Sequence, residues 1–302
     1  MPSAGDTRQQ LTVETERRNR LSVPSFAGGF LYLLSAIIIA STLNGAPTVG
    51  LLQGLAPAFS GIASPSVSPR AVEVKFISHH AFPLIAGSAL AAIAVGALTL
   101  ILLVLLDATV YRRPNSWAPA RTLVIIGGIA VAIASIAHQV VGAVETHNFA
   151  VGHDFSSHAV DQALTKGTPA VVVAYLSLIA ALLLATGMVA TMINALRVGL
   201  LPRWMSFLGM FTALLIFLPI GGAELQVVPS FWMVMMGILY SCKWPGGELP
   251  AWRTGEAVPW PTRAQMQAER AAQNGKGDAD ITPAATAPSG GNRRRRKRSG
   301  RH

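Results

Sequence analysis

The sequence predicts an all-α membrane protein: a bundle of about six transmembrane helices with both termini in the cytoplasm. Only 13% of the 302 residues are charged and 51% are hydrophobic, whereas soluble domains carry about twice that charged fraction. The charges also gather in the terminal segments and loops. Long stretches, such as residues 76–106 and 122–144, contain no Asp, Glu, Lys or Arg. Uncharged apolar stretches of this length are typical of helices that cross a bilayer.

Six segments have, or come close to, the length of a membrane span. A helix needs about 20 mostly apolar residues to cross roughly 30 Å of hydrocarbon. We expect the cytoplasmic N-terminal segment at residues 1–25, a six-helix transmembrane domain at 26–242 and a cytoplasmic tail at 243–302. The last predicted span is the shortest, and it has Pro229 in its first turn, where proline is tolerated. The spans are predicted at about residues 26–43, 82–106, 122–144, 170–196, 205–222 and 227–242.

The distribution of Lys and Arg predicts the orientation, because cytoplasmic loops carry an excess of these residues. With six spans, four basic segments fall on one side, and the opposite loops hold only Arg70, Lys75 and Lys166. We therefore expect a multi-pass protein of the cell membrane. Asp107 is predicted to form an interfacial ion pair with Arg112 or Arg113. The basic residues of the four segments are Arg17, Arg18, Arg20, Arg112, Arg113, Arg121, Arg197, Arg203 and Lys243.

The tail changes composition sharply after Lys243. Trp252 and Trp260 alternate with prolines, and we expect them to lie against lipid headgroups or a partner. From Gly275 the chain has too few large apolar residues to fold. Its basic end is predicted to bind anionic lipids, while the folded reader or stacking aromatics typical of nucleic-acid binding are absent there. This end contains Arg293, Arg294, Arg295, Arg296, Lys297 and Arg298.

Histidine is concentrated on the predicted outer face, together with several carboxylates. Imidazoles and carboxylates are ligands for zinc and copper, and paired histidines can hold a haem. Histidines at an acidifying surface can also sense pH, and histidines of membrane-edge loops can simply suit the interface. His138 lies inside a predicted span, where an ionisable group tends to need a partner, and Glu224 is the candidate. The candidate metal ligands are His79, His80, His138, Glu145, His147, His153, His158 and Glu224.

The sequence does not indicate a reaction. It has no glycine-rich phosphate loop and no recognisable pairing of a nucleophile with a base. We therefore predict a non-enzymatic membrane protein without a resident cofactor. The alternatives are a transporter whose outer vestibule is lined by the histidines, and a membrane protein that binds haem, copper or zinc. Small residues four apart, such as Gly128 and Ala132, favour close helix packing within the chain, or with a protein partner or second copy.

Three short segments carry a family resemblance. They are Gly28–Leu34, which opens the first predicted span, Arg197–Arg203, between the fourth and fifth, and Trp244–Pro261 in the tail. These segments resemble those of a class of bacterial, largely actinobacterial, six-span membrane proteins that have no established activity. The resemblance implies the six-span topology and implies no activity.

Overall fold

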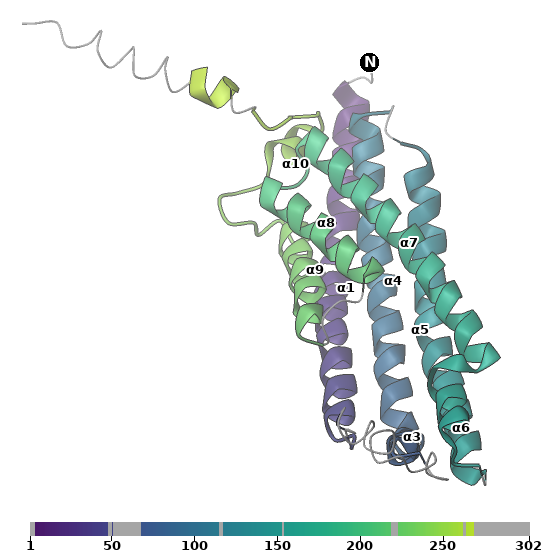
Figure 1. The fold of residues 1–302 in the computed structure, drawn as a ribbon. Coiled ribbons are helices and arrows are strands. Elements are labelled where there is room, and N and C mark those ends of the chain that lie inside the picture. Colours follow the sequence, from purple (N-terminus) through teal and green to yellow (C-terminus); the bar gives the residue numbers. More distant parts are fainter. Residues whose placement is uncertain are drawn as a thin grey trace, which may run out of the picture. The chain divides into compact units, whose positions relative to one another are not determined.

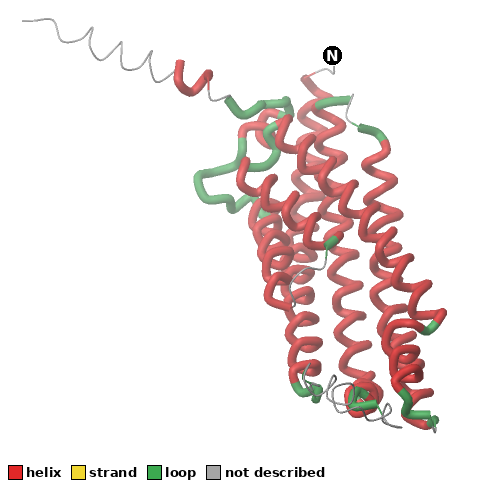
Figure 2. Tube along the Cα trace, viewed as in Figure 1, coloured by secondary structure: helices red, strands yellow, loops and turns green. Residues whose placement is uncertain are grey.

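The computed structural model of the chain describes residues 4–47, 50, 68–114, 117–152, 154–218, 223–261 and 264–268. The chain forms two units, Met1–Trp260 and Pro261–His302. The part of the second unit that the structure describes beyond Pro261 is a single helical turn at 264–268. The described residues are helices joined by turns and loops, with no strand among them (Figure 2). The predicted all-α class is therefore confirmed.

Four long helices form the frame of the first unit (Figure 1). They are α1 (Ala4–Asn44), α4 (Ala81–Arg112), α5 (Pro119–Val151) and α7 (Thr168–Val198). All four are long and apolar enough to cross a membrane, and they contain the first four predicted spans. Prolines in the first turn begin α5 and α7, because the missing N–H of proline costs nothing there.

Two shorter apolar helices complete the bundle. α8 (Arg203–Phe217) has 15 residues and α9 (Val227–Tyr240) has 14, which correspond to lengths of about 22 and 21 Å. They overlap the fifth and sixth predicted spans, and each is shorter than the roughly 30 Å of a hydrocarbon core. A 3₁₀ turn, η2 (Ala223–Gln226), precedes α9.

Close helix packing holds the frame together. α4 packs against α1, α5 and α7, α9 packs against α1, and α8 contacts both α7 and α9. α5 and α7 approach closely, since a Cβ added at Gly127 would collide with the backbone nitrogen of Leu184. A Cβ at Gly187 would lie 3.0 Å from the backbone nitrogen of Val124. The predicted role of small residues in helix packing is therefore realised between α5 and α7.

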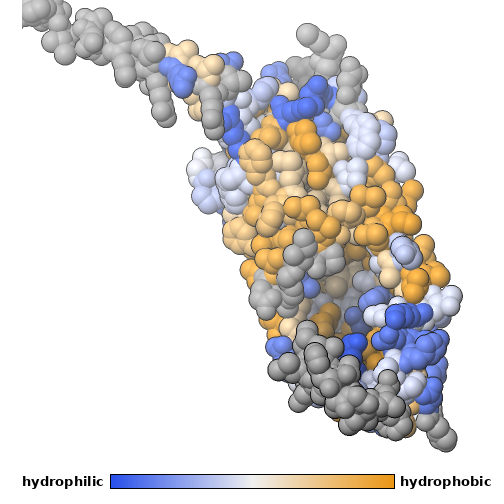
Figure 3. Space-filling model, in the orientation of Figure 1, coloured by the Kyte–Doolittle hydropathy of each residue, from blue (hydrophilic) through white to orange (hydrophobic). Residues whose placement is uncertain are grey.

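One end of the bundle carries a small helical cap, which we call the distal end. It contains α3 (Ala71–His79), α6 (Ser157–Asp161) and the π-helical turn η1 (Gln162–Lys166). Val74 of α3 and Phe149 of α5 are buried there with Val160. In Figure 3 hydrophilic side chains gather at this end, over α6, and apolar ones form a band nearer the middle of the bundle. The segment between the third and fourth predicted spans, at 145–169, is therefore largely helical.

The opposite end is closed by the segment after α9, whose short helix α10 (Pro250–Thr254) packs against the bundle. We call this the charged end, because Glu14, Arg18, Arg112 and Glu248 meet there. The compact unit therefore continues to Trp260, whereas the sequence had assigned everything after position 242 to the tail.

Candidate functional site at the charged end

Arg112, in the last turn of α4, forms the most deeply buried ion pair of the described residues. Its Nη1 and Nη2 donate to the two carboxylate oxygens of Glu14 on α1, at 3.2 and 2.9 Å. Nε and Nη2 also donate to the Ala251 carbonyl of α10, at 3.1 and 2.9 Å, and Nη1 to the Ala108 carbonyl at 2.8 Å. The side chains of Arg112 and Glu14 are 0% and 9% exposed. A buried guanidinium needs this many acceptors, because an unpaired buried charge is costly.

Arg18 lies one turn after Glu14 on α1 and is also buried, with 1% exposure. Its Nη2 forms an ion pair with Glu248 and donates to the sulfur of Cys242 at 3.1 Å. Within the described part of the chain, Nε and Nη1 have no hydrogen-bond partner. The guanidinium carbon instead lies 4.4 Å from the centre of the Trp252 ring. An aromatic face attracts a cation through its quadrupole. The Trp252 ring therefore stabilises the part of the Arg18 guanidinium that has no hydrogen bond.

Trp252 is the centre of this arrangement and is only 3% exposed. Arg112 approaches the same ring, at 5.2 Å. The rings of Tyr240 and Trp252 form an edge-to-face pair, with their centroids 6.5 Å apart. The indole N–H donates to the Leu200 carbonyl at 2.8 Å. The expected placement of Trp252 at the headgroups is therefore wrong, since the ring is buried inside the chain.

The segment after Trp252 is attached to the end of α7. Gly199 ends this helix with φ 76°, a conformation that glycine adopts without strain. The Leu200 N–H donates to the Ala195 carbonyl at 3.0 Å, as in a Schellman cap. The Val258 N–H donates to the Val198 carbonyl at 3.1 Å, and the Trp260 indole donates to the Leu201 carbonyl at 2.9 Å. Residues 248–260 are thus fixed to α1, α4 and α7.

Asp107 forms a second, more exposed set of ion pairs beside this cluster. Its carboxylate contacts Arg121 at 2.6 Å and Arg17 at 3.6 Å. The prediction that Asp107 pairs with Arg112 or Arg113 is wrong, because Arg112 turns to Glu14 and Ala251 instead.

The four buried or half-buried charges of Glu14, Arg18, Arg112 and Glu248 cancel. The cluster can therefore hold segments together, and it offers no surplus charge for a substrate.

The described candidate ligands of the predicted histidine site do not converge on one point. Among the described residues, no three His, Cys, Asp or Glu side chains lie close enough to hold a metal ion. His138 and His147 lie on α5, nine residues apart, which separates them by about 14 Å along the helix, whereas zinc ligands lie about 2 Å from the ion. His138, His147 and His158 are exposed.

The remaining candidate ligands are also dispersed. Nδ1 of His79 lies 2.7 Å from the Lys75 carbonyl, and Nδ1 of His80 lies 2.9 Å from the Phe76 carbonyl. The His80 ring stacks on Phe76, at a centroid distance of 4.0 Å. A Cβ at Gly167 would lie 3.2 Å from an oxygen of Glu145, so this carboxylate lies against the turn before α7. The described residues therefore do not form the predicted constellation.

The proposed partnership of His138 and Glu224 is not supported. His138 is exposed on α5, whereas η2, the turn that contains Glu224, packs against α1 and α9. His153, the side chain of Glu224 and the basic run from Arg293 to Arg298 lie outside the described residues.

At the distal end, the Ser156 N–H donates to the Asp154 carboxylate at 2.9 Å, which lowers the pKa of Asp154 below its ordinary value.

Comparison with known proteins adds no relative: no protein-family model, no curated protein and no solved structure matches this chain.

Proposed function

We propose that this protein is a non-enzymatic, multi-pass protein of the cell membrane that holds a basic C-terminal tail at the cytoplasmic surface. The four long apolar helices support a position in a bilayer, because each has the length and composition of a membrane span. The observation that supports the anchoring role is the buried cluster of Arg18, Arg112 and Trp252, which attaches residues 248–260 to the helix bundle.

Six crossings with cytoplasmic termini are part of this proposal. The positive-inside rule supports this orientation. The contacts of Glu14 with Arg112 and of Arg18 with Glu248 bring the beginning of the bundle and its last segment to one end. A chain that starts and finishes at the same end crosses an even number of times. In this proposal the charged end faces the cytoplasm.

The tail supplies the interaction with lipid. Arg293 to Arg298 comprise six consecutive basic residues, and each basic residue near an anionic leaflet contributes about 1 kcal/mol of binding. Trp260 is hydrogen-bonded to the end of α7, so the tail leaves the bundle from a fixed point at the charged end. An anchored origin raises the effective concentration of the tail at the surface. Weak individual contacts then suffice to keep it there.

Reconstitution of the full chain in vesicles tests this role. A fluorophore is attached at Ser299→Cys in a Cys242→Ser background, and its quenching by nitroxide-labelled lipids is measured. We expect strong quenching in vesicles that contain anionic lipid, and weak quenching in zwitterionic vesicles or in about 1 M salt, where the Debye length is about 3 Å. The matched control replaces Arg293–Arg298 by glutamine. Equal quenching in both lipids would refute the tail-binding role.

A further inference from the structure

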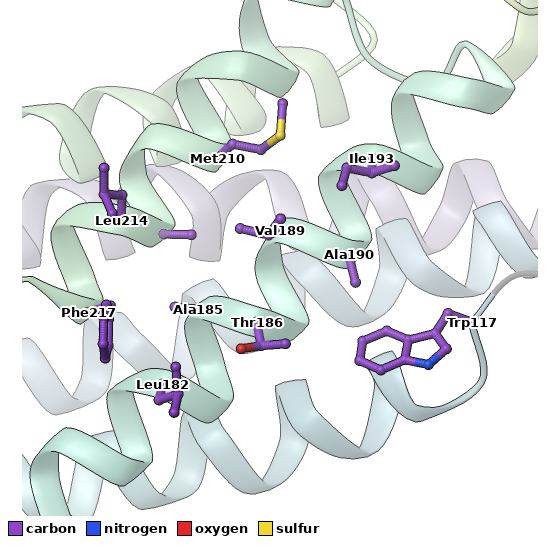
Figure 4. Close-up of a pocket in the computed structure, with 11 residues that line it drawn as sticks. Trp117, Leu182, Ala185, Thr186, Val189, Ala190, Ile193, Met210, Leu214 and Phe217 are labelled. Carbon is purple, nitrogen blue, oxygen red and sulfur yellow. The ribbon is translucent and has the colours of Figure 1, made fainter.

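An apolar groove runs between α7 and α8. Its volume is about 500 Å³, and alanines at 185, 190 and 213 leave it hollow between larger residues of the two helices. Figure 4 shows Leu182 and Phe217 at one end of the groove and Trp117, from the segment before α5, at the other. The groove lies on the surface of the bundle, since Leu182 and Trp117 are 48% and 47% exposed.

The length of the groove matches one leaflet of a bilayer. Along α7 it extends from Leu182 to Ile193, eleven residues or about 16 Å, and one leaflet provides about half of the roughly 30 Å hydrocarbon core. An empty groove there would forfeit dispersion contacts on its walls, and an apolar wall does not hold water. An extended hydrocarbon chain has the shape and the chemistry to fill it.

The end of the groove at Trp117 offers a cation. Arg197 lies four residues after Ile193 and therefore on the same face of α7. It is exposed, and no carboxylate within the described residues forms an ion pair with it, in contrast to Arg18, Arg112 and Arg121. A guanidinium suits a phosphate, because its N–H groups match the geometry of the oxygens. Trp117 is the kind of residue that settles at the headgroup level.

We propose that this groove binds one anionic phospholipid of the leaflet at the charged end. An acyl chain lies between α7 and α8, and Arg197 contacts the phosphate. The apolar walls select a hydrocarbon chain, and the exposed cation at the headgroup level favours a lipid with net negative charge over a zwitterionic one. This site is separate from the basic tail and does not depend on it.

Native mass spectrometry of the purified full chain tests the proposal, in a background where Arg293–Arg298 are glutamine so that the tail cannot retain anionic lipid. After exchange with phosphatidylglycerol or phosphatidylcholine, we expect one retained phosphatidylglycerol. Arg197→Gln is expected to reduce the preference for the anionic lipid about tenfold, or about 1.4 kcal/mol, because it removes charge-assisted hydrogen bonds to the phosphate. Arg253→Gln, another exposed arginine at the charged end, is the matched control.

A second variant tests the groove itself by filling it. Thr186→Phe introduces a ring at an exposed lining position, and we expect it to abolish lipid retention. Ile133→Phe, on an outward face of α5 that is 63% exposed, should leave retention unchanged. Unchanged retention in Thr186→Phe would overturn the groove as the site, and equal preference in Arg197→Gln and Arg253→Gln would overturn the phosphate contact. A dimer that Thr186→Phe dissociates would instead identify a second copy as the occupant.

Discussion

The guanidinium of Arg18 on α1 lies over Trp252 of α10, with its central carbon 4.4 Å from the ring centre. Arg112 of α4 approaches the same indole at 5.2 Å. Two buried cations would repel each other in a low-dielectric interior. Here each has a carboxylate partner, Glu248 or Glu14, and both contact the same indole. The stability of the charged end therefore depends on an aromatic residue close to the end of the compact unit.

Trp252→Ala should strongly destabilise the bundle. The change removes a ring that is 3% exposed and leaves the Leu200 carbonyl without its donor. It also removes the aromatic ring that the Arg18 guanidinium contacts. Removal of a buried large aromatic typically costs about 3–5 kcal/mol. Equilibrium unfolding in SDS, followed by circular dichroism, measures the cost. Trp204→Ala is the control, since Trp204 is 46% exposed and stacks on Trp244 near the surface. Equal costs for the two variants would contradict the central role of Trp252.

Removal of one partner of the buried ion pair should cost more than removal of both. Glu14→Leu leaves Arg112 buried without its carboxylate, and breaking a buried pair in this way typically costs about 3–5 kcal/mol. The double variant Glu14→Leu, Arg112→Met removes both charges. It should recover part of the loss, although the Ala251 carbonyl also loses its donor. A double-mutant cycle in the same unfolding assay measures the coupling.

The control for this cycle is Glu16→Leu, because Glu16 pairs with Arg20 at the surface, where both side chains are more than half exposed. Surface pairs contribute about 0–1 kcal/mol. A cycle that shows no coupling between Glu14 and Arg112 would mean that water reaches the pair in the folded protein.

The long apolar stretches made the four long helices predictable, because hydrophobic length is a local property of the sequence. The charged end was not predictable in the same way. Glu14 and Arg112 are far apart in the chain, and nothing local distinguishes Arg112 from Arg113. Arg112 is buried because it lies on the side of α4 that faces α1 and α10. The distance from the apolar segments also made Trp252 look like an interfacial residue, although its ring packs on Tyr240.

The described histidines do not converge, for a related reason. The prediction of a histidine site considered only how deep each residue lies in the membrane. Residues at similar depth can still face different directions. His138 and Glu145 share α5 with His147, so their separation along the helix axis was already fixed by the helical rise. The start of α9 was not predictable either. Sequence hydropathy does not reveal that a 3₁₀ turn at Ala223–Gln226 leads into the helix.

Two glycines of α5 should respond in opposite ways to alanine. Gly127→Ala places a methyl group against the backbone of Leu184, so α5 and α7 must separate and the bundle should lose about 1–3 kcal/mol. A methyl group at Gly142 would meet no described atom of another helix within 4 Å, and alanine there should stabilise by up to about 1 kcal/mol through helix propensity. Thermal unfolding in one detergent compares the two variants. Similar destabilisation by both would contradict the close α5–α7 contact.

The orientation predicts which positions react with a membrane-impermeant maleimide applied to intact cells. In a Cys242→Ser background, a cysteine at Asn148 of α5 should be labelled, and cysteines at Arg113 and Arg253 should react only after the cells are opened. The two ends of α5 lie on opposite sides of the membrane in this proposal, so the pattern follows from the bundle geometry. Labelling of Arg253→Cys in intact cells would exclude a cytoplasmic charged end.

Position 222 separates six crossings from four. If the segments that contain α8 and α9 both cross, a cysteine at Gly222 lies at the outer surface, and we expect it to be labelled in intact cells as readily as Asn148→Cys. The helices alone reach about 22 and 21 Å, so the residues between Phe217 and Val227 must supply the remaining thickness of the roughly 30 Å core. A cysteine at 222 that stays unlabelled in intact cells, while Asn148→Cys reacts, would show that α8 and α9 form a hairpin that enters and leaves on one side.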